Sequence, residues 1–351
     1  MANGSVFVLG ATGQIGRAAV RALAADGWHV RAASRSAGRD DGWPGDVQSV
    51  AVDREDDAAL AAALGDGCDV LVDCVAYGQG HARQLLGLAD RIGSAVVISS
   101  GAVYEDDTGR SFDTQGEPDG FPAYPVPIPE SYRTVAPGDL TYGTRKVALE
   151  RELLAAGDRL PTTLLRAGAV HGPHSRLSRE LYFVKRALDG RPVRVLSWRG
   201  ESRFHTVHVD NLAELARLAA GRPGSRVLNA GDPEALSVAE ISAAVDTVAG
   251  VKSETVLVDG APPRPGLGET PWSVARPVVL DMSAAERELG YRAVTGYAES
   301  LPRTVEWLAG ELAGRDWREA FPLMAELDPD DRLFGYAAED DWLNATRARA
   351  I

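Results

Sequence analysis

The sequence has few cysteines and no long apolar run. Its two cysteines, Cys68 and Cys74, flank a predicted strand whose extended backbone keeps them too far apart for a disulfide, which indicates a reducing compartment. No apolar run approaches the roughly 18 residues of a membrane span. The N-terminus also lacks the basic-then-apolar pattern of a secretion signal. We therefore expect a cytoplasmic protein that has no membrane partner.

Positive charge is also in short supply. There are 37 Lys and Arg residues against 50 Asp and Glu, which gives a net charge of −13. Such an acidic chain argues against nucleic acid or an anionic membrane as the main partner. Cysteines at metal-binding spacing and internal repeats are missing too. The chain of 351 residues, 45% hydrophobic and 25% charged, is of ordinary globular composition and can form one large or two modest domains.

The N-terminal segment carries the clearest motif. Four apolar residues at 6–9 predict a strand buried on both faces, and a helical pattern that ends at Gly27 follows three evenly spaced glycines. Such glycines let the chain turn tightly and let a pyrophosphate approach the backbone, while the helix N-terminus offers unpaired N–H groups. The alternative is a tight turn without a ligand. We predict a dinucleotide site formed by Gly10, Thr12, Gly13, Gln14, Ile15 and Gly16.

Strand and helix patterns alternate through the first 170 residues. This alternation predicts an α/β fold, a doubly wound parallel sheet of the Rossmann type. The rhythm breaks over residues 105–140, where six prolines are typical of a functional loop or lid, or of a solvated insertion. Further strands are expected at 28–33, 49–52, 69–73, 95–99 and 162–166, and helices at 56–64, 80–92 and 141–156.

The pattern is less regular beyond residue 170. The C-terminal tail, 313–351, combines many acids with aromatic residues such as Trp317, Phe334 and Trp342. Because such aromatic density is rare in disordered chains, we expect the tail to dock on its own subunit or on a neighbour. Before it we expect helices at 177–188, 211–220 and 238–248, extended segments at 193–196, 205–209 and 226–229, and short helices with proline-rich turns up to 312.

A tyrosine and a lysine lie four residues apart on the predicted helix 141–156. Tyr142 and Lys146 therefore share one helix face. Lys146 is one of only three lysines beside 34 arginines, which suggests that an ammonium is chemically required there. The ammonium, together with an oxidised nicotinamide, is expected to lower the pKa of Tyr142, which then exchanges a proton as hydride moves. Ser100, at the end of a predicted strand, would hydrogen-bond the reacting oxygen, and Lys146 would also hold the nicotinamide ribose. An ordinary surface pair is the alternative.

The residues after the second predicted strand bear on the choice of cofactor. An acid at this place would hold the ribose hydroxyls of NAD, but the chain has Ser34 and Arg35, with Arg39 near. A guanidinium with a hydroxyl neighbour suits a 2′-phosphate better, so we predict NADP, with NAD as the alternative. Asp53 and Arg54 are expected to frame the adenine. The other expected cofactor contacts are Val75, Ala76, Ser99 and Ala169, besides Tyr142 and Lys146.

At these residues the chain resembles the extended short-chain dehydrogenase/reductase family, of the NAD(P)-dependent epimerase/dehydratase type. The resemblance covers residues 4–310 and rests on the glycine motif, Ser100, the Tyr142–Lys146 pair and segments at 165–173, 208–213 and 229–231. It implies a Rossmann domain at 1–170, to which 203–231 returns, and a substrate-binding domain at 171–202 and 232–312, with the active site between them. It also implies a homodimer through helices 80–92 and 141–156.

Departures from the family pattern bear on the substrate. Gly101-Ala102 stands where family dehydratases carry an acidic pair, which disfavours sugar dehydration. Phe204 replaces an arginine that usually grips a nucleotide-sugar phosphate, and Arg203 lies one place early. The first change points away from dehydratases, and the second from a nucleotide-sugar substrate.

Four residues are expected to line the substrate pocket: Tyr77, Tyr104, His171 and Arg203. Tyr77 replaces a small residue and would crowd the nicotinamide side. Tyr104 could instead pack beneath the 105–140 segment, and His171 could be a satisfied core histidine.

No metal site is expected. His171, His174, His205 and His208 invite a zinc interpretation, but residues three apart on a strand point to opposite faces. The leading hypothesis is therefore an NAD(P)(H)-dependent oxidoreductase that moves a hydride to or from a carbonyl or carbinol carbon of a small polar or sugar-like substrate. A sugar or nucleotide-sugar epimerase that uses transient oxidation is the close alternative. A non-catalytic dinucleotide-sensing protein is the third.

Overall fold

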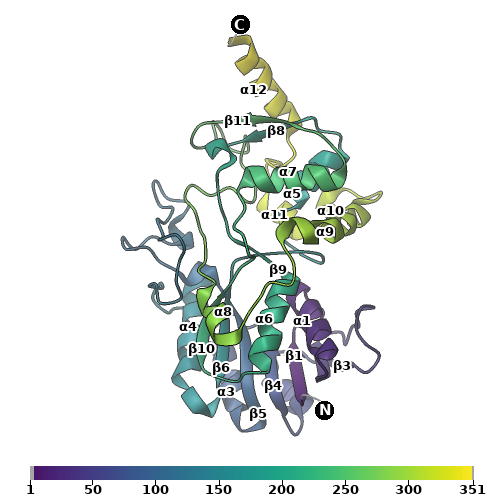
Figure 1. The fold of residues 1–351 in the computed structure, drawn as a ribbon, viewed down its shortest axis with the longest axis vertical. Coiled ribbons are helices and arrows are strands. Elements are labelled where there is room, and N and C mark those ends of the chain that lie inside the picture. Colours follow the sequence, from purple (N-terminus) through teal and green to yellow (C-terminus); the bar gives the residue numbers. More distant parts are fainter. Residues whose placement is uncertain (1–3, 350–351) are drawn as a thin grey trace. The chain divides into compact units, whose positions relative to one another are not determined.

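The chain divides into two compact units in the computed structural model, which describes residues 4–349. Unit 1 contains the residues up to Val170 together with His205–Glu234 and Val278–Gly296. Unit 2 contains His171–Phe204, Ala235–Pro277 and the residues from Tyr297 onward. Figure 1 traces both along the chain. Within the described residues no helix is both long and apolar enough to span a bilayer.

Seven parallel strands form the central sheet of unit 1, and the predicted doubly wound fold is confirmed. The strand order reverses between β1 and β4, which is the place where open parallel sheets bind their ligands. In spatial order the strands are β10 (Arg226–Ala230), β6 (Thr162–Ala167), β5 (Ile92–Ser100), β4 (Cys68–Asp73), β1 (Ser5–Leu9), β2 (His29–Ser34) and β3 (Gln48–Ala51).

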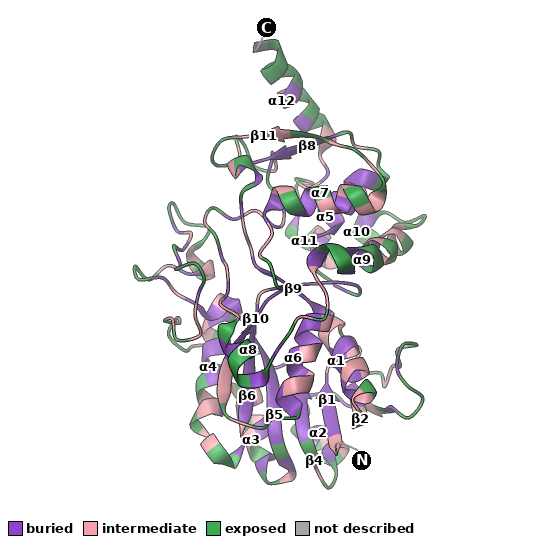
Figure 2. Cartoon of the chain, viewed as in Figure 1, coloured by how far each residue is buried: buried purple, intermediate pink, exposed green. Residues whose placement is uncertain are grey.

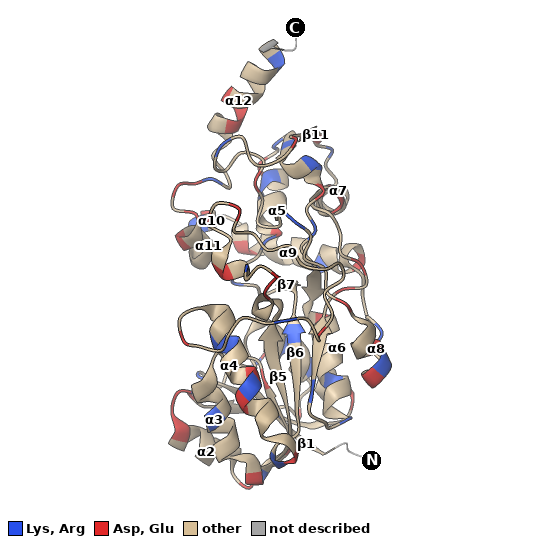
Figure 3. Cartoon of the chain, turned by 90° about the vertical axis from the view of Figure 1, so that its left-hand side faces the viewer, with Lys and Arg blue, Asp and Glu red and all other residues tan. Residues whose placement is uncertain are grey.

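Helices cover both faces of this sheet. Because side chains alternate along a strand, Val6 and Val8 pack with α1 (Gln14–Ala25) and α6 (Val209–Ala220). Phe7 and Leu9 pack on the other face with α2 (Asp57–Leu64), α3 (Gln79–Gly87) and α4 (Tyr142–Ala155). The inner strands are therefore buried while the helices keep an exposed side, and the edge strand β3 is mostly exposed (Figure 2). Charged residues mark the exposed sides of these helices, with both signs on α4, an acid on α2 and an arginine on α3 (Figure 3).

Short elements complete unit 1. β9 (Thr206–His208) pairs with β7 (Ala169–His171), which runs to the boundary of the unit. The others are η1 (Ala89–Arg91), η2 (Gly101–Val103), η3 (Phe112–Thr114), η4 (Gly157–Arg159) and α8 (Ser283–Leu289).

The segment 105–140 is packed on itself. The buried carboxylate of Asp106 accepts hydrogen bonds from the N–H groups of Thr108, Arg110 and Ala123. Burial alone would raise the pKa of Asp106, but these bonds hold it well below the ordinary value. The rings of Phe112 and Phe121 meet edge to face at 6.0 Å. The segment is thus held by its own contacts, and its role as a lid stays a prediction.

Unit 2 is mainly helical. A two-stranded parallel sheet of β8 (Val193–Leu196) and β11 (Glu254–Leu257) accompanies the helices. The sequence analysis missed β11, and it predicted only short helices where α9 runs for 16 residues. The buried, helically spaced residues Tyr297, Leu301 and Leu308 favour α9 despite Pro302 within it. The helices are α5 (Leu181–Leu188), η5 (Trp198–Gly200), α7 (Val238–Ala249), α9 (Tyr297–Leu312), α10 (Trp317–Ala320), α11 (Pro322–Leu327) and α12 (Tyr336–Arg349).

Residues 278–296 lie in unit 1, although the sequence placed them in the second domain. The Ile128 N–H donates to the Val279 carbonyl oxygen at 2.7 Å. The side-chain oxygen of Asn211 accepts the N–H of Val294 at 2.9 Å. These contacts join segments that are more than 80 residues apart, which local patterns cannot reveal. The remaining domain boundaries, and the substrate-binding role of unit 2, stay predictions.

The C-terminal tail packs on its own chain within unit 2. The Arg186 guanidinium donates to Glu339 Oε2 at 2.8 Å, and both side chains are almost fully buried. Arg191 lies 3.3 Å from the other carboxylate oxygen. A buried carboxylate therefore joins α12 to residues near α5.

Replacing Glu339 by Gln should destabilise the protein strongly. The substitution leaves the buried Arg186 charge without its counter-charge, so we expect the free energy of unfolding to fall by about 3–5 kcal/mol. Asp340→Asn is the matched control, because Asp340 pairs with Arg191 at 2.7 Å but its side chain is 52% exposed. Its loss should cost less than about 1 kcal/mol. Urea denaturation measures both, and equal costs would contradict this account of the tail.

Candidate functional site

The turn between β1 and α1 leaves room only for glycine at two positions. Gly10 has a φ of +77°, and a Cβ atom there would lie 2.5 Å from the side chain of Val75. A Cβ atom at Gly16 would lie 2.2 Å from the carbonyl oxygen of Gly10. The backbone is therefore bare where β1 ends, at the point where the strand order reverses.

The N-terminus of α1 opens on this bare turn. Gly13 caps the helix without a side-chain hydrogen bond, and no acidic residue lies in the first turn. The first N–H groups of a helix have no partner within the helix, and they carry the positive end of its dipole. A pyrophosphate fits this place, because both its charge and its need for close backbone approach are met. The predicted residue Thr12 lies in this turn, and Gln14 and Ile15 are the first two residues of α1.

The end of β2 offers an unpaired hydroxyl beside an arginine. Ser34 is buried, and its Oγ has no hydrogen-bond partner among residues 4–349. The next residue, Arg35, is exposed. By contrast, the Arg39 guanidinium donates to the carbonyl oxygens of Val47 and Trp43, at 2.8 and 3.2 Å, so it serves its own loop. Ser34 and Arg35 could hold a phosphate at this strand end.

The structure gives Arg54 a different partner from the predicted adenine. Its guanidinium donates to the Asp73 carboxylate at 2.6 Å and to the Gln84 side-chain oxygen at 2.8 Å. Arg54 is only 8% exposed, whereas Asp53 beside it is exposed. Arg54 therefore belongs to a buried ion pair. Of the two residues predicted to frame the adenine, only Asp53 is exposed.

Tyr142, Lys146 and Ser100 lie together at the carboxyl edge of the sheet. Lys146 Nζ donates to the carbonyl oxygens of Ala76, at 2.6 Å, and Ile98, at 2.9 Å. It lies 5.6 Å from the centre of the Tyr142 ring, one helical turn away on α4. Lys146 is 3% exposed and Tyr142 is 44% exposed, so the ammonium is buried beneath a phenol that a substrate can reach.

Burial controls the pKa of both residues. It lowers the pKa of Lys146 to about 8, although the carboxylates of Asp73 and Glu150 oppose the shift. It also raises the pKa of Tyr142, and a hydrogen bond with Ser100 offsets this only in part. In the protein alone burial therefore outweighs the ammonium, and a lowered pKa of Tyr142 beside an oxidised nicotinamide stays a prediction. Since the ordinary pKa of a phenol is about 10, Tyr142 carries its proton near neutral pH.

Two predicted ligand contacts are instead part of a buried polar network. Ser99 Oγ donates to Glu150 Oε1 at 2.5 Å, and Arg166 donates to Glu150 Oε2 at 2.7 Å. The Arg166 guanidinium lies over the Tyr104 ring at 4.9 Å, and the Tyr104 hydroxyl donates to Asn229 at 2.6 Å. Tyr104 is fully buried, so it follows the packing alternative.

Three members of this network were not among the predicted site residues: Glu150, and Arg166 and Asn229, which were noted only within the family segments. A usable signal existed, because Glu150 follows Lys146 by four residues on the same face of α4.

The other three substrate candidates lie in different units. In unit 1, Tyr77 is 53% exposed, with its ring centre 6.5 Å from that of Tyr142 and 5.2 Å from Lys146 Nζ. It therefore lies at the candidate site.

In unit 2, His171 is buried and lies 3.7 Å from the Glu180 carboxylate, and its ring centre is 4.7 Å from that of Tyr297. Arg203 donates to the Ala235 carbonyl oxygen and lies 3.3 Å from Glu240. These contacts fit the satisfied-histidine alternative for His171 and give Arg203 a structural partner. The backbone of Ala169, in unit 1, donates to the His205 carbonyl oxygen at 2.8 Å.

The histidines form no metal centre in the described part of the chain. His205 is buried, with one ring nitrogen 2.9 Å from the Asp232 carbonyl oxygen and the other accepting the Leu280 N–H at 3.0 Å. No group of three or more His, Cys, Asp or Glu side chains among residues 4–349 is placed to hold a metal ion.

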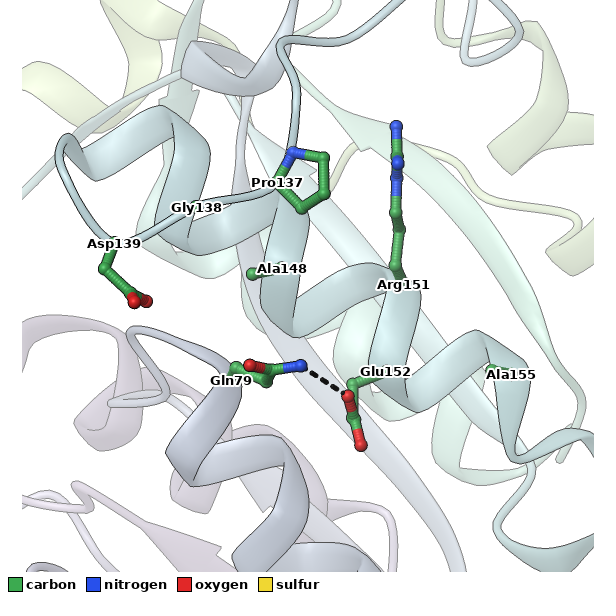
Figure 4. Close-up of a pocket in the computed structure, with 8 residues that line it drawn as sticks. All are labelled: Gln79, Pro137, Gly138, Asp139, Ala148, Arg151, Glu152 and Ala155. Carbon is green, nitrogen blue, oxygen red and sulfur yellow. Dashed lines mark hydrogen bonds between the residues drawn. The ribbon is translucent and has the colours of Figure 1, made fainter.

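A hollow of about 410 Å³ on the outer face of α3 and α4 is separate from the triad (Figure 4). Its α4 residues, such as Arg151 and Glu152, lie on another face of the helix from Lys146. Gln79 of α3 donates to Glu152 at 2.7 Å beside it. The hollow lies on the surface that the predicted homodimer would use, and that contact stays a prediction.

The chain matches a known family over more than half of its length. The family model described as "NAD dependent epimerase/dehydratase family" matches residues 6–231. The 2′-dehydrokanamycin reductase of Streptomyces kanamyceticus is 30% identical over 236 residues, which are 64% of this chain and 60% of that protein. The match thus spans less than two thirds of that relative's length.

Solved structures share the fold. An epimerase of Methanothermobacter thermautotrophicus is 17% identical and superposes with a TM-score of 0.67, over 89% of this chain and 94% of its own. The UDP-glucose 4-epimerase of Thermus thermophilus, solved with NAD, is 23% identical with a TM-score of 0.63, over 87% of this chain and 99% of its own. At this level of identity the likeness establishes the architecture.

Replacing Gly16 by Ala should abolish dinucleotide binding. A methyl group there collides with the Gly10 carbonyl oxygen, so we expect the affinity for NADPH or NADH to fall by at least about tenfold, or 1.4 kcal/mol. Gly80→Ala in α3 is the control, because a Cβ atom there meets nothing within 4 Å. Quenching of protein fluorescence measures binding, and circular dichroism verifies folding. Unchanged affinity in a folded Gly16→Ala variant would contradict the assignment of the turn.

Proposed function

Because the chain belongs to the NAD-dependent epimerase/dehydratase family, as its resemblance to extended short-chain dehydrogenases predicted, we propose that it reduces a ketone through Ser100, Tyr142 and Lys146. The observation that carries this proposal is an accessible, protonated phenol above a buried ammonium at the carboxyl edge of a parallel sheet. A nicotinamide dinucleotide bound at the glycine turn would supply the hydride. The substrate gains that hydride on carbon and one proton on oxygen.

Tyr142 is the proton donor in this reaction. A phenol is protonated at neutral pH, since its ordinary pKa is about 10, so the Tyr142 hydroxyl can give a proton to the ketone oxygen as the carbon is reduced. The Ser100 hydroxyl can donate a hydrogen bond to the same oxygen. The Lys146 ammonium, 5.6 Å from the ring centre, stabilises the phenolate that remains until a solvent proton replaces the one lost.

A polar, sugar-like ketone is the substrate class that best fits the chain. The relative from Streptomyces kanamyceticus is named as a reductase of 2′-dehydrokanamycin, which supports a ketone on a cationic amino-sugar framework. The net charge of −13 suits a cationic ligand. Gly101-Ala102, in place of an acidic pair, gives no carboxylate for a dehydration step.

Epimerisation is the second candidate, because the solved neighbours include epimerases. In that reaction the same triad would oxidise a carbinol and reduce the transient ketone from its other face. A reductase consumes one NAD(P)H per product, whereas an epimerase shows no net change in nicotinamide absorbance. Measuring that absorbance during turnover separates the two.

Replacing Tyr142 by Phe should remove the proton donor while leaving the fold intact. We expect kcat for ketone reduction to fall by about 10²–10⁴-fold, with NADPH binding unchanged. Tyr291→Phe is the matched control, because the buried Tyr291 hydroxyl has no hydrogen-bond partner in the described chain. Steady-state kinetics with a soluble polar ketone measure the effect. Retention of full kcat in Tyr142→Phe would refute the proposed role.

We infer a preference for NADP(H), supported by the unpaired Ser34 hydroxyl next to the exposed Arg35. Arg35→Ala should lower kcat/KM for NADPH by about 10–100-fold, the value of one or two charge-assisted hydrogen bonds, and leave NADH almost unaffected. Arg39→Ala is the control, since Arg39 binds carbonyl oxygens of its own loop. An equal loss with both cofactors, or better use of NADH by the wild type, would overturn the preference.

A further inference from the structure

The buried carboxylate of Asp73 connects the glycine turn with the lysine of the triad. Asp73 Oδ2 accepts the Arg54 guanidinium at 2.6 Å, and Oδ1 accepts the Val75 N–H at 2.9 Å. The Val75 side chain fills the space beside Gly10. The next carbonyl in the chain, that of Ala76, accepts Lys146 Nζ at 2.6 Å.

From this chain of contacts we propose that Asp73, held by Arg54, is a positioning residue for Lys146. The carboxylate fixes the turn after β4 so that the Ala76 carbonyl faces the ammonium, and its charge balances that of the lysine. The proposal rests on the proposed function, in which Lys146 acts beneath Tyr142. Asp73 itself is fully buried and takes no part in the chemistry.

The Arg54 guanidinium is held from two sides, so the ion pair of Arg54 and Asp73 has one arrangement. Besides the bond to Asp73, its guanidinium donates to Gln84 at 2.8 Å. The Gln84 side-chain nitrogen returns a hydrogen bond to the Arg54 carbonyl oxygen at 2.6 Å. A buried ion pair is often no more stable than a well-packed apolar pair. The geometry thus favours a role in placing the Ala76 carbonyl over a role in folding alone.

Two charge pairs and three further groups surround the lysine. The carboxylates of Asp73 and Glu150 face it, but Arg54 and Arg166 already pair with them. The Cys74 thiol and the rings of Tyr77 and Tyr142 complete the surroundings. These surroundings account for the shift in the Lys146 pKa. Burial lowers the pKa to about 8 and Arg54 acts in the same direction, whereas Asp73 and Glu150 oppose the shift.

The test measures the protonation of Lys146 directly. With only three lysines in the chain, Lys146, Lys185 and Lys252, the Cε signals of protein labelled with ¹³C-lysine can be followed over pH by NMR. In the wild type the Lys146 signal should titrate near pH 8. Asp73→Asn removes the carboxylate that balances the Arg54 charge beside Lys146. The midpoint of the Lys146 titration should therefore fall by at least about 1 pH unit. The double variant Arg54→Gln/Asp73→Asn should bring it back toward the wild-type value.

Two controls separate positioning from general destabilisation. Lys185 and Lys252 report on the rest of the chain, and their midpoints should not move. Asp57→Asn removes a carboxylate that contacts Gln84 at 2.6 Å but is not one of the charges around Lys146, so it should leave the Lys146 midpoint unchanged. A shift in Asp57→Asn equal to that in Asp73→Asn would contradict the proposal.

The dependence of kcat on pH provides a second readout, and the direction of its change is predicted. Lys146 is charged below its pKa, so kcat for ketone reduction should be highest below about pH 8 and fall above it. In Asp73→Asn this fall should begin at a lower pH, with KM for NADPH within about twofold of the wild type. A pH profile that matches the wild type while the Lys146 midpoint stays near 8 would overturn the inference. The loss of kcat in Tyr142→Phe tests the proposed function independently.

A pair of double variants keeps the test decisive if Asp73→Asn does not fold. Arg54→Gln/Asp73→Asn and Arg54→Met/Asp73→Leu both remove the charges, and apolar replacement of a buried pair is usually tolerated. Only the Gln/Asn variant keeps a side-chain oxygen at position 73, and this oxygen can accept the Val75 N–H. We therefore expect kcat to be at least about tenfold lower in the Met/Leu variant than in the Gln/Asn variant. Equal kcat and equal Lys146 midpoints in the two variants would refute the proposal.

Discussion

The bonds from the Lys146 ammonium to two main-chain carbonyls organise the polar chemistry of unit 1. Ile98 lies within β5, and Ala76 follows β4, so the two acceptors come from neighbouring parallel strands. Parallel strands end at the same edge of a sheet, which is why their carbonyls can meet one side chain. A buried ammonium is costly unless its donors are satisfied, and these two acceptors offset part of that cost. The sheet thus creates a fixed place for one positive charge.

The surroundings of this charge determine which group gives up a proton. Each carboxylate near Lys146 already has an arginine partner, so the lysine gains less from them than from an unpaired carboxylate. Desolvation then dominates, and both the lysine and the tyrosine move toward their neutral forms. A neutral tyrosine is an acid rather than a base. The same arrangement that buries the lysine therefore leaves a protonated phenol at the carboxyl edge of the sheet.

The sequence revealed what depends on neighbours along the chain. The apolar run at 6–9, the glycines after it and the four-residue spacing of Tyr142 and Lys146 gave the sheet, the turn and the shared helix face. It could not reveal which charges meet, because Arg54 and Asp73 are 19 residues apart and Glu150 and Arg166 are 16 apart. For that reason Ser99 and Arg54 were assigned to ligands instead of to buried pairs.

The turn after β4 unites the two halves of the candidate site. Val75 packs against Gly10 on one side, and the Ala76 carbonyl next to it holds Lys146 on the other. A change in the glycine turn therefore reaches Lys146 through Val75 and the Ala76 carbonyl next to it. Gly10 must be a glycine partly because Val75 occupies the space of its missing side chain, which ties the shape of the dinucleotide turn to the position of the ammonium. The candidate dinucleotide turn and the Tyr142–Lys146 pair share one structural element, and both lie where the strand order reverses.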